Sequence, residues 1–176
     1  MKDEEDRAFV RSALAAHEPA LLRFAASLVG SAHAADVVQD TFLALCKAER
    51  TTVSGHLAAW LFTVCRNRAL DLKRTRGRLS ELREEDEMES PDSGPASRVE
   101  RQQALGRIES ALSGLSPEQR QAVILKFSGG LKYKEIAEVM ELSVTNVGFI
   151  LHTALKALRT ELAGTSRVLE TVRSAP

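Results

Sequence analysis

The chain has 176 residues, enough for one domain or two small ones, and its 44% apolar and 5% aromatic content suits compact helical packing. Abundant Ala, Leu, Glu and Arg and only ten glycines predict an all-α fold. The formal net charge is zero, no apolar run approaches the ~20 residues of a membrane span, and the acidic start MKDEEDR is unlike a signal peptide, so we expect a soluble cytoplasmic protein without membrane contact.

Three helices are predicted in the first 47 residues. The first covers about Glu5 to Ala16, and Pro19 begins the second, which Gly30 ends. Ser31 is the expected N-cap of the third helix, which runs from Ala32 to about Lys47. These residues, which begin and end helices, predict a compact group of short helices at the N-terminus.

The third helix carries a polar strip beside an apolar stripe. Asp36, Gln39 and Asp40 form the strip. The stripe consists of Val37, Val38, Phe42, Leu43 and Leu45. From spacing alone, a solvated helix face is the favoured interpretation of the strip.

A fourth helix is predicted over residues 57–78, LAAWLFTVCRNRALDLKRTRGR, after a short loop. Residues 58–78 hold six Lys or Arg and one Asp, the strongest local positive charge in a chain whose formal net charge is zero. One side buries Trp60, Leu61, Val64, Ala69 and Leu72, and the other presents Arg66, Arg68, Lys73, Arg74, Arg76 and Arg78. These cations either complement the helix dipole or, with Trp60 and Asn67, suit a groove for single-stranded DNA. Asp71 is expected to pair with Arg68 or Arg74.

A flexible acidic linker divides the chain. Residues 79–96, LSELREEDEMESPDSGPA, are acidic, low in apolar content and broken by two prolines and a glycine. Ser97 with Glu100 forms a capping box that opens the next helix. We therefore expect two small helical domains, over residues 1–78 and 97–164, followed by a tail over 165–176.

The second domain has the pattern of a helix-turn-helix. The run Ser-Pro-Glu-Gln at 116–119 is an N-cap, a first-turn proline and a capping-box glutamine, and Gly129 with Gly130 ends that helix. A short helix follows in YKEIAEVM, and Ser143 caps another that runs from about Val144 to Ala163. The second helix of this helix-turn-helix could enter a DNA major groove. The alternative is that the two helices form an ordinary hairpin in a helical bundle.

The last helix exposes few charges. With Val147, Leu151, Leu155 and Leu158 on the core side, the outward face holds Thr145, Asn146, Gly148, Phe149, His152, Thr153 and Lys156. Asn146 can pair with adenine and Phe149 can contact a thymine methyl, although a protein contact for Phe149 is also possible. Ile150 lies nearer the core side and is expected to pack.

No metal, cofactor or catalytic site can be assembled from the sequence. Cys46 and Cys65 lie far apart and without a CxxC, so we interpret them as buried free thiols rather than as a disulfide or metal ligands. The four histidines are scattered, and a P-loop, a GxSxG and an HExxH are absent. The expectation is a protein that is not an enzyme and takes no small-molecule substrate.

The residues AADVVQDTFLAL resemble the segment with which sigma-70 family transcription initiation factors dock on the clamp helices of the polymerase largest subunit. The family's usual form is Asp-Leu-Val-Gln-Glu-Thr-Phe, and residues 36–42 match it in order with conservative changes. The resemblance implies that Asp36, Gln39 and Asp40 face core RNA polymerase, and that Phe42 packs inside.

The fourth helix resembles the family's minus-10 segment. AWLFTVCRNRALDLKR is similar to the pattern WL-x-x-I-A-x-N-x-x-x-D-x-x-R, with Trp60, Leu61, Asn67, Asp71 and Arg74 on its named positions. In the family this helix and the preceding loop melt the minus-10 element and hold an unpaired base. The implied DNA contacts are Trp60, Arg66, Asn67, Arg68, Lys73 and Arg74.

The run YKEIAEVM, the serine after it and the helix ending in ALKALR resemble the family's C-terminal domain, which binds the minus-35 element. The implied DNA contacts are Thr145, Asn146, Phe149, His152, Thr153 and Lys156. This helix departs from the family pattern, because Gly148, Phe149, Ile150 and Thr153 stand where Lys, Ser, Arg and Arg are usual.

The order of these segments around a linker is that of the extracytoplasmic-function group. The resemblance implies a promoter-specificity subunit without catalysis or cofactor, whose partners are core RNA polymerase (clamp helices and flap), promoter DNA and an anti-sigma factor. Two other hypotheses are a sigma-like decoy that titrates an anti-sigma factor and a dimeric helix-turn-helix regulator.

Overall fold

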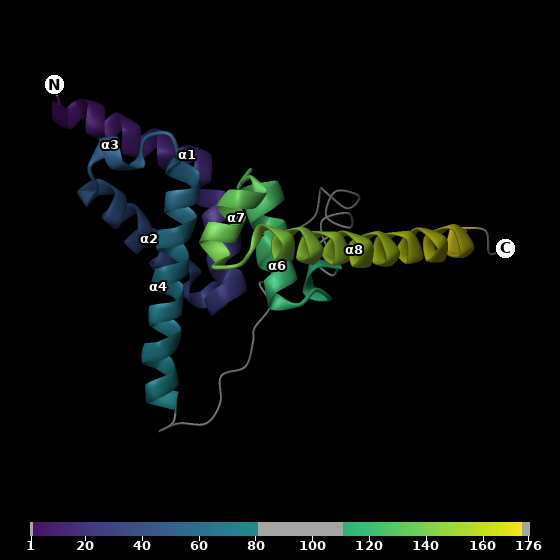
Figure 1. Ribbon diagram of the computed structural model, residues 1–176. Coiled ribbons are helices and arrows are strands. Elements are labelled where there is room, and N and C mark those ends of the chain that lie inside the picture. Colours follow the sequence, from purple (N-terminus) through teal and green to yellow (C-terminus); the bar gives the residue numbers. More distant parts are fainter. Residues whose placement is uncertain (1, 81–110, 174–176) are drawn as a thin grey trace.

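The computed structural model describes residues 2–80 and 111–173, and every regular element within these ranges is helical (Figure 1). The elements are α1 (Lys2–Val29), α2 (Ser31–Lys47), α3 (Arg50–Val53), α4 (Leu57–Ser80), α6 (Pro117–Val123), the π-helix η1 (Ile124–Ser128), α7 (Tyr133–Met140) and α8 (Val144–Arg173). The all-α prediction is therefore confirmed. The predicted linker beyond residue 80 and the capping box at Ser97 lie outside the described residues.

Helix α1 continues through Pro19, so the prediction of two separate helices here is wrong. Proline inside a helix removes one hydrogen bond and crowds the preceding turn, at a cost of ~3 kcal/mol. Ala13 before the proline, and Leu21 and Phe24 after it, are all buried on one continuous face. Burial of that face compensates for the local cost, so tertiary packing overrides the proline.

Helix α2 begins one residue earlier than predicted. Its N-cap is Gly30, which has a φ of 81°, and Ser31 is the first helical residue. The prediction of Ser31 as the cap is wrong, and no side chain makes the cap hydrogen bond. A glycine suits the positive φ that reverses the chain between α1 and α2. The segment after α2 holds the short helix α3, whose Val53 is buried.

Helices α1, α2 and α4 pack around two aromatic rings. Phe24 of α1 meets Phe62 of α4 edge to face, with ring centroids 5.3 Å apart. The buried hydroxyl of Thr41 donates to the Val37 carbonyl at 2.8 Å. Cys65 is buried as predicted, whereas Cys46 is exposed, so the prediction of two buried thiols is wrong for Cys46.

Helix α6 starts with the predicted capping box. Ser116 Oγ accepts from the Gln119 N–H at 3.2 Å, and the Gln119 side-chain oxygen accepts from the Ser116 N–H at 3.1 Å. The helix widens into η1, which ends as the Gly129 N–H donates to the Ile124 carbonyl at 2.9 Å. Gly130 then takes a φ of 69°, as the predicted helix end requires.

The predicted helix-turn-helix is present in α7 and α8. Helix α7 spans the YKEIAEVM run, and Glu141 follows it with a φ of 57°. Ser143 Oγ accepts from the Asn146 N–H at 3.2 Å and so caps α8 as predicted. Helix α8 runs on to Arg173, ten residues beyond the predicted end, through a stretch without proline.

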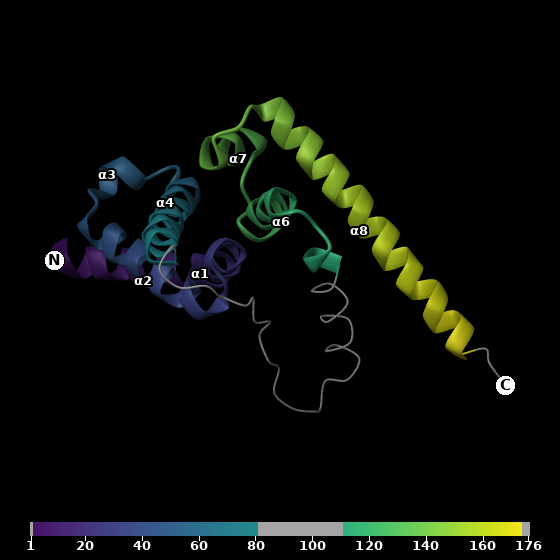
Figure 2. The same ribbon diagram turned by 90° about the horizontal axis from the view of Figure 1, so that it is seen from below.

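The two halves of the molecule pack directly against each other. Helix α7 contacts α4, and α6 and η1 contact α1, while α8 projects away from the N-terminal helices (Figures 1 and 2). The buried apolar side chains of both halves form one continuous cluster. A Cβ added to Gly129 would lie 2.8 Å from the Phe62 ring, so this ring can lie against the backbone of residue 129 because that residue is glycine.

Candidate functional site

The polar strip of α2 lies on its solvent face. Asp36, Gln39 and Asp40 are exposed. On the opposite side Val37, Val38, Phe42 and Leu45 are buried. No hydrogen bond or ion pair within the described residues engages the three strip side chains. The strip is therefore free to accept a partner.

Leu43 adds an apolar residue to this exposed face. Its side chain is 51% exposed, so its predicted place in the buried stripe is wrong. Leu43 follows Gln39 and Asp40 by four and three positions, and such residues share one helix face. Helical spacing counted from Gln39 could have predicted that Leu43 lies on the exposed face. We define the docking face as Asp36, Gln39, Asp40 and Leu43.

The basic half of α4 is mostly exposed. Asn67, Arg68, Lys73 and Arg74 point to solvent, and Trp60 is half-buried. Arg74 Nη1 lies 3.3 Å from Asp71 Oδ1, which confirms one of the two predicted partners of that acid. Arg66 differs from the other cations, because it pairs with Glu141 at 3.1 Å and its side chain is only 17% exposed. The structure thus joins the cationic helix to the C-terminal half.

The outward face of α8 is built as its sequence predicts. Val147, Leu151 and Ala154 are buried, and Phe149 on the opposite side is 69% exposed. Thr145, Asn146, His152 and Lys156 are exposed around Phe149. Ile150 packs partly against the core, as expected. Asn146 has no side-chain partner among the described residues, so its amide is free.

Thr153 lies at the edge of this face rather than on it. Its hydroxyl donates to the Phe149 and Ile150 carbonyls at 3.0 Å, and it accepts from Gln119 Nε2 at 3.2 Å. This residue links α8 to α6. The ring of Tyr133 lies against Gly148, where an added Cβ would sit 3.9 Å away. Tyr133 extends the apolar surface beside Phe149, and helical spacing along α8 could not find it because it belongs to α7.

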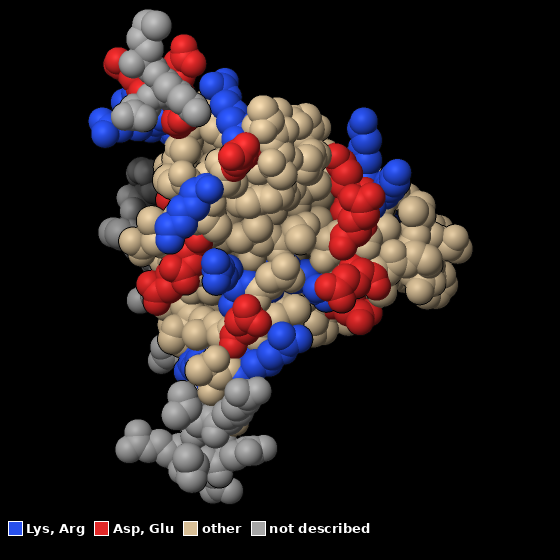
Figure 3. Space-filling view, turned by 60° about the vertical axis from the view of Figure 1, so that its left-hand side comes forward, with Lys and Arg blue, Asp and Glu red and all other residues tan. Residues whose placement is uncertain are grey.

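Figure 3 shows acidic and basic side chains interspersed on the face that it displays. In the described part of the chain, no group of three His, Cys, Asp or Glu residues could hold a metal ion. The helices of that part also lack the combination of length and apolar content that a membrane span needs.

Burial raises the pKa of the Cys65 thiol to about 12, although a hydrogen bond with Thr41 opposes the shift. This thiol is therefore inert at neutral pH.

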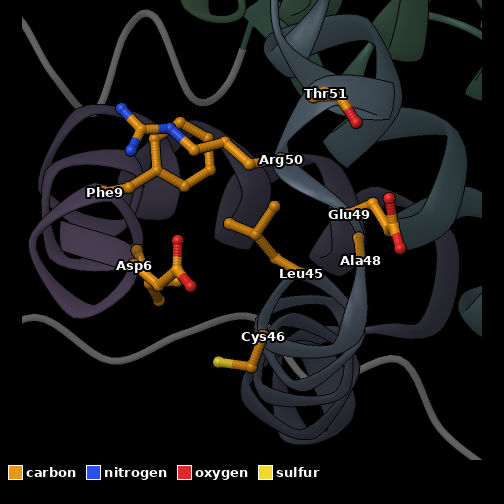
Figure 4. A pocket seen from close by; sticks show the side chains of 9 residues that line it. Asp6, Phe9, Leu45, Cys46, Ala48, Glu49, Arg50 and Thr51 are labelled. Atoms are coloured by element: carbon orange, nitrogen blue, oxygen red, sulfur yellow. The ribbon is translucent and has the colours of Figure 1, made fainter. Parts of the chain in front are cut away.

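A surface pocket of about 320 Å³ lies between α1 and the chain around α3 (Figure 4). Asp6, Glu49 and Arg50 line it beside the exposed thiol of Cys46. The Arg50 guanidinium stacks over the Phe9 ring, 5.0 Å from its centroid. This stacking joins the N-terminal turns of α1 to α3. We therefore interpret the pocket as a result of the packing between these helices.

Comparison with known families matches both halves of the chain. The model of sigma-70 region 2 matches residues 13–79, and that of sigma-70 region 4 matches residues 105–158. The first match covers the docking face and the basic half of α4. The second covers the helix-turn-helix. The two matches therefore fall on the surfaces that the geometry leaves exposed.

Individual relatives agree with this division. The ECF RNA polymerase sigma factor SigE of Mycolicibacterium smegmatis is 32% identical over 163 residues, which cover 90% of this chain and 63% of the relative. SigL of Mycobacterium tuberculosis, also named an ECF RNA polymerase sigma factor, is 32% identical over 164 residues, covering 89% of this chain and 90% of the relative. The chain thus spans less than two thirds of the first relative and most of the second.

A solved structure matches across both halves. The sigma factor RpoE of Bartonella quintana, crystallised in complex with the anti-sigma factor NepR, superimposes with a TM-score of 0.68 and 29% identity. The match covers 93% of this chain and 98% of that one.

Proposed function

The chain belongs to the extracytoplasmic-function group of the sigma-70 family, and on this premise we propose that it is the promoter-specificity subunit of a bacterial RNA polymerase. The observation that carries the proposal is the match of one chain to both sigma-70 regions, with a relative that it covers almost completely. The protein binds core polymerase and promoter DNA and directs transcription initiation. It works by positioning, without catalysis of its own, and acts in the cytoplasm with its polymerase.

We assign three surfaces to three steps. The docking face of α2 binds the clamp helices of core polymerase. The cationic part of α4 binds the minus-10 element, where arginines neutralise phosphates and Trp60 with Asn67 contacts unpaired bases. The outward face of α8 binds the minus-35 element. Residues 1–78 and 97–164 are the two functional domains, and 79–96 link them so that two weak contacts add their affinities.

An anti-sigma factor regulates the activity. The matched structure of RpoE holds its anti-sigma factor NepR, and the match extends over nearly the whole chain. A partner that covers the docking face or the helix-turn-helix would silence a protein that acts only through its surfaces.

The proposal is tested by binding to core polymerase. Purified chain is mixed with core enzyme and passed over a sizing column, and we expect it to elute with the core at a 1:1 ratio. An excess of an unrelated helix-turn-helix regulator is the control and elutes alone. Separate elution of the chain at micromolar concentrations would contradict the proposal.

Arg74→Ala tests the minus-10 contacts. The side chain of Arg74 is 72% exposed, so its removal leaves the fold intact but removes one cation from the opened strand. We expect the slope of log affinity against log salt for the holoenzyme on a pre-opened promoter to fall by about 0.7, the value for one single-strand phosphate contact. Arg23→Ala, at an exposed position on α1, is the matched control and should leave the slope unchanged. Equal slopes for Arg74→Ala and wild type would refute the contact.

Asn146→Ala tests the minus-35 contacts. A free amide that pairs with adenine contributes ~1–3 kcal/mol of discrimination against other bases. We expect the substituted holoenzyme to lose about 5- to 150-fold of its preference for the native upstream element over a scrambled one. The measurement is competition between two promoter fragments that differ only there. Unchanged preference, together with loss of a protein partner on Phe149→Ala, would make α8 a protein-binding helix instead.

A further inference from the structure

We propose that the exposed rings of Phe149 and Tyr133 form one apolar surface that reads C5 methyl groups of thymine in the major groove of the minus-35 element. Phe149 lies on the outward face of α8, and Tyr133 is the first residue of α7. This role rests on the function proposed above, because base selection by α8 requires that the helix-turn-helix binds promoter DNA. Phe149 then determines which base is preferred, and Tyr133 completes the surface.

The two rings lie next to Gly148. A Cβ added at Gly148 would be 3.9 Å from Tyr133 Cε2, and Phe149 is the following residue. Tyr133 is 42% exposed and Phe149 is 69% exposed. The Phe149 ring makes no aromatic or cation contact within residues 2–80 and 111–173. Both rings therefore present apolar area that the described part of the chain leaves uncovered.

The first half of α8 is free of charged residues. Residues 144–155 hold no Lys, Arg, Asp or Glu, and Lys156 is the first charged residue of the helix. Few phosphate contacts can come from this half, so its contribution to DNA binding has to come from base edges.

Phe149 is placed to meet a base edge. It is the sixth residue of α8, and the N-terminal residues of a recognition helix are those that contact base edges in the major groove. The pattern that base pairs show there consists of hydrogen-bond donors, acceptors and the C5 methyl group of thymine. That methyl group is the apolar partner that a phenyl ring can bury. An aromatic side chain at this position therefore selects thymine.

Lysines beside Tyr133 favour DNA over an apolar protein surface as the occupant. Lys126 Nζ lies 5.3 Å from the centre of the Tyr133 ring and donates to the Leu131 carbonyl at 3.3 Å, which holds it in place. Lys132 and Lys134, the sequence neighbours of Tyr133, are exposed. Cations at the edge of the surface suit the phosphates that border a groove, and the rings suit the bases on its floor.

Deoxyuridine tests the methyl contact, because it pairs as thymine does and lacks only the C5 methyl group. A promoter that the holoenzyme transcribes is prepared with each thymine of its minus-35 element replaced in turn, on both strands. We expect replacement at one or two positions to weaken holoenzyme binding by about fourfold per methyl group. Competition between the thymine and the uracil duplex measures this ratio. Equal binding at every position, or an element without thymine, would overturn the proposal.

Variants assign the contact to the rings. Phe149→Ala should bind the thymine and uracil duplexes equally at the sensitive position, because the ring that contacts the methyl group is gone. Tyr133→Ala should lower the ratio, and Tyr133→Phe should keep it, since the ring rather than the hydroxyl makes the contact. Phe127→Ala, which removes a 62% exposed ring from η1, is the matched control and should keep the full ratio.

A wild-type ratio in Phe149→Ala would overturn the proposal, and a wild-type ratio in Tyr133→Ala would overturn the part of Tyr133. Unchanged DNA affinity of Phe149→Ala together with loss of a protein partner would overturn it in favour of a protein-binding surface.

Salt separates a methyl contact from a phosphate contact. The ratio of thymine to uracil binding should be the same at about 50 and about 200 mM salt, because burial of a methyl group releases no counterions. A ratio that falls over this range would overturn the methyl contact. Normal core binding and transcription without any uracil effect would overturn thymine reading alone. Failure to bind core polymerase would overturn the proposed function, and thymine reading with it.

Discussion

Phe62→Ala should destabilise the protein by ~3–5 kcal/mol, more than any substitution of an exposed side chain. Phe62 is fully buried, meets Phe24 edge to face and lies against Gly129 of the C-terminal half. Its removal leaves a cavity at the point where the two halves share their core. Because ~1 kcal/mol shifts the melting temperature of a chain of this size by about 2–4 °C, we expect a drop of roughly 6–20 °C by differential scanning calorimetry.

Phe149→Ala is the matched control for that measurement. It makes the same chemical change at a side chain that is 69% exposed, and surface substitutions usually stay within ~0.5 kcal/mol. A melting temperature for Phe62→Ala within about 2 °C of the control, equivalent to less than ~1 kcal/mol, would show that the shared core does not stabilise the molecule.

Asp36→Ala with Gln39→Ala should weaken binding to core polymerase by about tenfold or more, since a truncated interface residue that matters costs ~1 kcal/mol or above. Both side chains are exposed and engage no other described residue, so circular dichroism and melting temperature should remain near wild type. The measurement is fluorescence anisotropy of chain labelled at Lys134→Cys, with the exposed Cys46 replaced by Ser, as core enzyme is titrated in.

The control for the docking face is Glu138→Ala, which removes an exposed acid from α7. Its affinity for core polymerase should equal that of wild type. If the double substitution on α2 also leaves the affinity unchanged, the docking assignment is wrong. Leu43→Ala extends the test, because its exposed side chain would provide apolar contact at the C-terminal end of the same face.

Local signals in the sequence predicted the helix ends well where a side chain makes the cap. The capping box at Ser116 and the cap at Ser143 depend on residues only three positions away, so pattern alone suffices. The exposed row around Phe149 follows from helical spacing in the same way. The docking assignment of the polar strip on α2 comes from resemblance and stays a proposal, because the spacing of the strip also fits a plain solvated face.

Features that depend on distant residues escaped prediction. The path of α1 through Pro19 is decided by what Leu21 and Phe24 pack against, not by the proline. The ion pair of Arg66 with Glu141 joins residues 75 positions apart, and the contact of Gly129 with Phe62 is equally remote. No local pattern encodes such pairs. The acidic segment predicted two small helical domains but not how they pack, and the packing of α7 on α4 became visible only in three dimensions.

Run-off transcription tests the promoter-specificity role most directly. Core RNA polymerase freed of sigma factors is incubated with the chain and a library of genomic promoter fragments from the same organism, and transcripts are mapped by their 5′ ends. We predict discrete start sites that require the chain and that share sequence elements at the minus-10 and minus-35 positions. Transcripts that are absent, or that start at the same positions without the chain, would contradict this role.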